Sequence, residues 1–116
     1  MNRTGAEVST LLEVVLQLHG ELRITLDPIR VTPLQAGVLL FLSRHAEARL
    51  TDAAATLRVR SATLSEVVKD LVHKRWVTKR RSVTDSRAVQ LQLSRQGHTL
   101  ARNIEERVRQ VEAILP

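Results

Sequence analysis

Hydrophobic residues recur along the first part of the chain at the three- and four-residue spacing of a helix. The stripe comprises Val8, Leu11, Leu12, Val15, Leu18 and Leu22, and it is broadened by Val14 and Leu16. This spacing predicts a helix from about Gly5 to Thr25, and Asp27-Pro28 ends it. Because so much of its circumference is apolar, the helix is expected to be buried within the monomer or to pack on a second chain.

The second helix has a well-marked start. Thr32 can cap it, Pro33 suits its first position, and Gln35 stands where a capping box requires Glu or Gln. The helix is expected to end near His45. Its buried face is predicted to consist of Leu34, Val38, Leu39 and Leu42.

Two further helices are joined by a tight turn. The first spans about 52–57 with Thr51 as its cap, and its alanines permit close approach of the second, which spans about 61–74. The second has one apolar face, made of Leu64, Val67, Val68, Leu71 and Val72. Its other face is polar and its ends are basic. This arrangement is typical of a helix-turn-helix.

Two β-like segments and a long helix follow. The first segment spans 76–81 and the second 87–93, where Val89, Leu91 and Leu93 alternate with polar or small residues as in a half-buried strand. Ser94 can cap a last helix that reaches Leu115. Its apolar stripe is Leu100, Ile104, Val108, Val111 and Leu115. The order of elements predicts a winged helix-turn-helix, a mainly α fold with a small β-hairpin.

The net charge of the chain is confined to its central segment. The 116 residues carry a formal charge of +6, and residues 58–87 account for all of it, with nine cations against three acids. The cations are Arg58, Arg60, Lys69, Lys74, Arg75, Lys79, Arg80, Arg81 and Arg87. Clustered Lys and Arg bind polyanions by releasing condensed counterions. Duplex DNA is the expected partner, because Phe41 and Trp76 are too few aromatics for single strands to stack on.

Other classes of function find little support. The absence of cysteine excludes disulfides, thiolate nucleophiles and Cys-based zinc sites. The four histidines lie on different predicted elements without an HExxH or paired-carboxylate pattern, so neither an enzyme nor a bound metal or cofactor is expected; a metal sensor built on His19, His45 or His98 is the weaker alternative. Glu7 and Glu13 interrupt the apolar N-terminal run, which excludes a signal peptide or membrane span and favours a cytoplasmic protein.

Several short motifs are similar to those of one family. They are residues 31–39 (VTPLQAGVL), 57–59, 61–65 and 74–77. The most specific is Asp85-Ser86-Arg87, an Asp-x-Arg wing followed by a leucine-alternating strand and a Ser-x-x-Gly helix start in residues 89–97. Over residues 8 to 115 the chain resembles the MarR family of winged helix-turn-helix bacterial transcriptional regulators.

This resemblance implies one winged-helix domain over residues 1–116 that dimerises through helices at about 5–25 and 95–115. The homodimer would bind a pseudo-palindromic operator and act as a repressor. The helix at about 61–74 would enter the major groove, and a basic wing at about 78–93 would reach the adjacent minor groove or the backbone.

The resemblance also assigns roles to individual residues. Arg87 maps onto the wing arginine and Asp85 onto the acid that orients it, although the two could merely tie the hairpin together. A guanidinium suits a narrow minor groove, and a carboxylate can fix its rotamer beforehand. Small hydroxyls and methyls on the recognition helix suit phosphates and thymine methyls. The expected DNA-binding residues are Arg60, Ser61, Ala62, Thr63, Ser65, Lys69, Lys79, Arg80, Arg81 and Arg87. Ser61 could also be the N-cap of its helix.

Four features depart from the family pattern. Glu66 could accept from a cytosine or pair with Lys69. Arg58 and Arg60 stand where Gly and Ser are usual and add charge at the tight turn. Arg75 stands where glycine often ends the helix, which predicts strain. The chain also stops before the family's usual last helix, so the alternative is an interaction module or antirepressor that pairs with a longer regulator. A small-molecule effector is left open.

Overall fold

The computed structural model describes residues 5–81, 83–84 and 88–113. In chain order its elements are α1 (Gly5–Leu26), the 3-10 helix η1 (Asp27–Ile29), α2 (Pro33–Arg44), β1 (Ala48–Arg49), α3 (Leu50–Leu57), α4 (Ser61–His73), β2 (Val77–Arg81), β3 (Val89–Leu93) and α5 (Arg95–Glu112). The order is that of the predicted winged helix-turn-helix, and the mainly helical fold class is confirmed.

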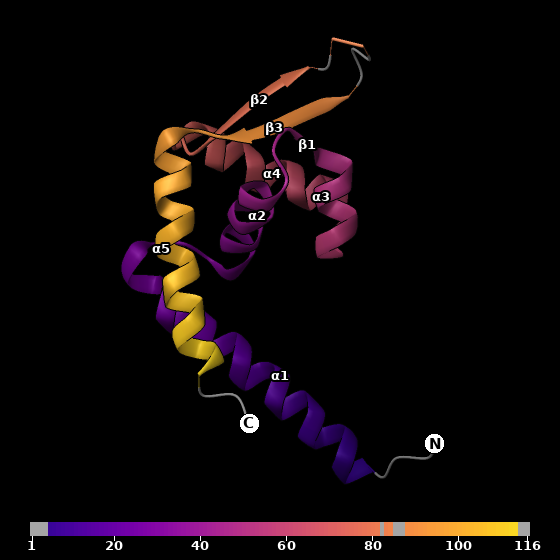
Figure 1. Cartoon of the computed structure of the whole chain (residues 1–116). Helices are drawn as coiled ribbons and strands as arrows, with labels where there is room; N and C mark the ends of the chain where they lie inside the picture. The colour runs from indigo at the N-terminus through magenta and orange to yellow at the C-terminus, as the bar shows by residue number, and fades with distance from the viewer. Residues whose placement is uncertain (1–4, 82, 85–87, 114–116) are drawn as a thin grey trace.

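The centre of the fold is α2, which contacts α1, α3, α4, α5 and β3 (Figure 1). Val38 and Leu39 of this helix are fully buried. Leu64 and Leu71 of α4 pack into the same core, as does Ile104 of α5. The apolar faces predicted for these helices are therefore the ones that turn to the core, except that Leu115 lies outside the described residues. These faces fix α4 and α5 on different sides of α2.

The sheet contains three antiparallel strands in the order β1-β3-β2. The predicted hairpin is present, with Val77 opposite Leu93 and Arg81 opposite Val89. The additional strand, β1, pairs Ala48 with Leu91 on the other edge of β3. Two residues are too few to display an alternating pattern, and neither is a strong β-former, so this strand could not be predicted from the sequence.

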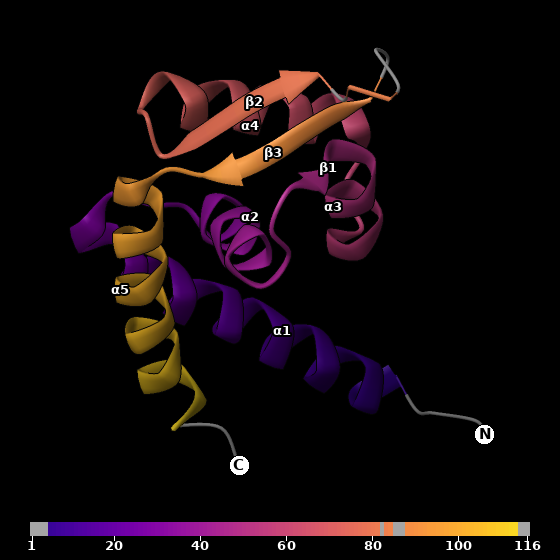
Figure 2. The same cartoon turned by 45° about the horizontal axis from the view of Figure 1, so that its top comes forward.

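The first helix is only partly covered by the rest of the chain. Its C-terminal half packs on α5, where the Arg107 guanidinium donates to the Thr25 carbonyl at 3.2 Å, and Leu26 is buried. Its N-terminal half extends away from the other elements (Figures 1 and 2). The exposed apolar side chains of α1 are Leu11, Leu12, Val14, Val15, Leu16 and Ile24. Of the two expectations for this stripe, burial within the monomer is therefore wrong from Leu11 to Leu16, whereas Leu18 and Leu22 are half-buried.

Two of the four predicted helix caps are confirmed. Thr32 and Gln35 form a reciprocal capping box at the start of α2, and Ser94 Oγ accepts from the Gly97 amide at 3.0 Å at the start of α5. The cap predicted at Thr51 is wrong, because α3 starts at Leu50, two residues earlier than predicted, with Arg49 in the extended cap conformation. The α4 helix starts at Ser61 as predicted, but Arg60 is its cap residue, so the alternative role of Ser61 as N-cap is wrong. Thr51 and Ser61 therefore lie inside their helices.

At the ends of α3 and α4, arginine occupies left-handed backbone where glycine is usual. Arg58 ends α3 with φ 54°, and Arg75 follows α4 with φ 64°. Each bend is closed by a backbone bond back into the helix, at 2.9 Å from the Val59 amide to Ala54 and at 3.0 Å from the Trp76 amide to Leu71. These are Schellman motifs in which a residue with a Cβ adopts left-handed backbone, where the Cβ crowds the neighbouring carbonyl oxygen. This crowding is a physical source for the strain predicted at Arg75.

We expect Arg75→Gly to stabilise the chain by about 1 kcal/mol, because relief of the left-handed Cβ strain exceeds the added flexibility of the unfolded chain. Urea unfolding at fixed protein concentration measures this change. Arg75→Ala is the matched control, since it removes the same charge but keeps the Cβ. Equal stability of the glycine and alanine variants would contradict the strain.

Candidate nucleic-acid interface

The outward face of α4 is exposed and carries small polar side chains. Ser61, Ala62, Thr63, Ser65 and Lys69 are all exposed, as is Arg60 just before the helix. On the opposite side, Leu64, Val68 and Leu71 are buried against the core. Because the apolar side of α4 is held by α2 and α3, the polar side is presented to a partner without any rearrangement.

The basic residues of β2 lie on both faces of the sheet. Alternation along the strand puts Lys79 and Arg81 on the face that carries the buried Val77, and Arg80 on the other face. Arg80 is paired across the sheet with Glu47, which precedes β1, at 2.8 Å. The three consecutive cations therefore cannot all contact the same DNA backbone. Lys79 and Arg81, which share a face, can contact it together.

Most of the other basic side chains are exposed without an acidic partner. Arg58, Arg60, Lys69 and Lys79 are exposed and form no ion pair with another residue of the described ranges. The same holds for Glu66, so its predicted pair with Lys69 is not formed. Acidic side chains of the described residues therefore leave most of this positive charge unpaired, as a surface that binds polyanions requires.

Two predicted site residues, Asp85 and Arg87, lie outside the described residues. Their roles in the wing stay predictions. The strands on either side of this segment are described, β2 up to Arg81 and β3 from Val89.

The structure adds three polar contacts that were not predicted from the sequence. Asp70 of α4 accepts from Gln35 Nε2 of α2 at 2.8 Å and from Lys74 Nζ at 3.1 Å. Glu47, which had no assigned role, holds Arg80. The Asp70–Lys74 spacing of four residues could have signalled their pair, but the other contacts join residues more than thirty positions apart.

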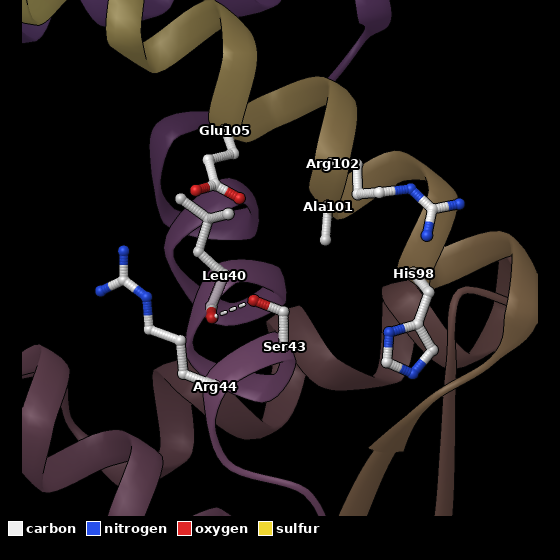
Figure 3. Close-up of a pocket in the computed structure, with 7 residues that line it drawn as sticks. All are labelled: Leu40, Ser43, Arg44, His98, Ala101, Arg102 and Glu105. Carbon is white, nitrogen blue, oxygen red and sulfur yellow. Dashed lines mark hydrogen bonds between the residues drawn. The ribbon is translucent and has the colours of Figure 1, made fainter.

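A cavity of about 310 Å³ lies between α2 and α5 (Figure 3). It is lined by Leu40, Ser43, Arg44, His98, Ala101, Arg102 and Glu105. Its two arginines extend in opposite directions, and the Ser43 hydroxyl already donates a hydrogen bond to the Leu40 carbonyl at 2.7 Å. The polar groups do not converge on one point, so the cavity gives no specific support to an effector site.

Within the described ranges, no cluster of three or more His, Asp or Glu side chains could hold a metal ion. None of the helices in those ranges combines the length and apolar character that crossing a bilayer requires. His45, one of the histidines considered for a metal, stacks on Phe41 with ring centroids 4.4 Å apart.

The geometry agrees with the family comparison. A model described as the MarR family matches residues 31–88, which is half of the chain and contains α2 to β2. The chain belongs to the MarR family. A sequence comparison with curated proteins finds no match.

Solved structures of MarR proteins share the fold. A mutant of MarR from E. coli in complex with operator DNA is 24% identical, with a TM-score of 0.79 over 88% of this chain and 74% of its own. Wild-type E. coli MarR without ligand is 20% identical, with a TM-score of 0.82 over 100% and 88%. The transcriptional repressor CouR bound to a 23-mer DNA duplex is 22% identical, with a TM-score of 0.82 over 93% and 80%.

Proposed function

We propose that this MarR-family chain is a transcriptional regulator that binds a pseudo-palindromic operator in duplex DNA as a homodimer and represses. The observation that carries the proposal is the exposed polar face of α4 beside a basic wing, in the segment that holds the whole net charge. Support also comes from E. coli MarR and CouR, which share the fold and are bound to DNA in their structures. DNA binding of this kind would occur in the cytoplasm.

In this proposal α4 enters the major groove. Ser61 and Ser65 donate to phosphates or base edges, and Ala62 and Thr63 supply methyl groups for thymine. The neighbouring cations, Arg60 and Lys69, contact the flanking phosphates. All these side chains are exposed on α4 or just before it.

The wing supplies a second contact. Lys79 and Arg81 share a face of β2 and would bind the DNA backbone, whereas Arg80 would have to leave Glu47 to do so. Arg87, oriented by Asp85, would reach into the minor groove, where a guanidinium is favoured by the negative potential. These contacts position the duplex, and α4 supplies the sequence preference.

A second copy of the chain is the proposed occupant of the exposed apolar side chains of α1. A patch of this kind on one extended helix is typical of a protein interface. Two copies related by a two-fold axis would present two α4 helices to successive turns of the major groove. The alternative occupant is a longer regulator, which the same surface would also fit.

Fluorescence anisotropy with selected and random duplexes tests the proposal, together with the mass from light scattering. Six to ten phosphate contacts predict a slope of about −5 to −9 in log affinity against log salt. We expect a dimer with that slope and a preference for one selected duplex. A monomer that does not bind duplex at moderate salt would contradict the regulator and favour the interaction module.

A further inference from the structure

A chain of hydrogen bonds links the start of α2 to the last turn of α4. Gln35 Oε1 accepts from the Thr32 amide at 3.0 Å, and Gln35 Nε2 donates to Asp70 Oδ2 at 2.8 Å. A backbone amide can only donate and a carboxylate can only accept, so the two partners together fix the orientation of the Gln35 amide. One side chain therefore closes the capping box of α2 and holds α4.

The Gln35–Asp70 bond is the stronger of the two contacts that Asp70 makes. It is partly buried and joins a neutral donor to a charged acceptor. The ion pair with Lys74 has side chains 37% and 44% exposed, and solvent screens such a pair. Lys74 also lies over the Trp76 ring at 5.2 Å, at the entry to the wing.

Asp70 has no evident value as a contact to DNA. A carboxylate on the helix proposed to enter the groove repels phosphates, and it lowers the local positive charge. Its partner, by contrast, belongs to α2, which also contacts α1 and α5. The bond therefore connects the reading helix to the helices proposed for dimerisation.

We infer that Gln35 and Asp70 are positioning residues that set the orientation of α4 on α2. Loss of their bond lowers the preference for the operator over random duplex. The affinity for random duplex depends only on the charge of the chain. The inference rests on the proposed function and adds two residues that need not touch DNA.

The test uses a substitution and its compensating partner in the full chain. Gln35→Glu keeps the acceptor that the capping box needs but replaces the 2.8 Å bond by two facing carboxylates. Adding Asp70→Asn restores an amide–carboxylate pair with donor and acceptor exchanged, and it returns the net charge to that of the original chain. Thr32→Ala is the matched control, because it weakens the capping box and leaves Nε2 of Gln35 on Asp70.

The probes are the duplex that the original chain selects from a random library and a random duplex of equal length. We expect Gln35→Glu to lower the ratio of the two affinities by about tenfold and Asp70→Asn to restore most of it in the combined variant. Thr32→Ala should lower the melting temperature and leave the ratio unchanged.

The possible failures are distinguishable. An original chain that prefers no duplex overturns the proposed function, and this inference with it. A preference that survives Gln35→Glu overturns the inference alone. A loss that Asp70→Asn does not restore also overturns it, because the net charge is then that of the original chain and the effect would not come from the bond between the two residues.

Discussion

Replacing Gly97 by alanine is expected to destabilise the chain by about 3 kcal/mol, as severe overpacking does. A Cβ on Gly97 would lie 2.0 Å from the Trp76 carbonyl oxygen and 3.0 Å from the Trp76 carbonyl carbon. The backbone there cannot yield easily, because the same carbonyl accepts from the Ser94 amide at 3.0 Å and Ser94 Oγ donates to the Arg75 carbonyl at 2.6 Å. Urea unfolding at fixed protein concentration measures the loss.

Gly37→Ala is the control for Gly97→Ala. A Cβ on Gly37 in α2 would meet only Leu57 Cδ2, at 3.7 Å, which is ordinary contact. This variant should gain up to about 1 kcal/mol from helix propensity. If both alanine variants unfolded at the same urea concentration, the start of α5 would not lie against the base of the wing as described.

The contrast between these glycines shows which features of the fold could be predicted from the sequence and which could not. Gly97 was visible as part of a Ser-x-x-Gly helix start, and Ser94 was visible as a cap, because both are local signals. The reason for glycine there is the Trp76 carbonyl, which comes just before the other strand of the hairpin and lies opposite the end of β3. Its position depends on the strand register, and no spacing in the sequence encodes that directly.

The same division applies to the candidate interface. The polar face of α4 could be predicted because helical periodicity separates it from the buried Leu64 and Leu71. Strand alternation could also have separated Arg80 from Lys79 and Arg81. Its pair with Glu47 could not have been predicted, because the strand β1 that follows Glu47 has no recognisable pattern. Long-range polar contacts of this kind were the main omission.

Replacing both Leu11 and Val15 by glutamate is expected to convert a dimer into a monomer and to weaken operator binding by about a hundredfold or more. These side chains lie one helical turn apart on α1 and are 60% and 52% exposed. A carboxylate buried against a second copy would be costly to desolvate. A monomer would also lose the second half-site, whose effective concentration can contribute roughly 10²- to 10⁴-fold in affinity.

Light scattering and anisotropy with the selected duplex measure the two effects of Leu11→Glu with Val15→Glu together. Gln17→Glu is the control, because Gln17 is exposed on the same helix and already polar. It should leave mass and operator affinity close to those of the original chain. A double variant that stays dimeric would place the interface elsewhere than on this part of α1. A monomeric variant with undiminished operator affinity would show that one α4 and one wing suffice, which is incompatible with a two-fold operator.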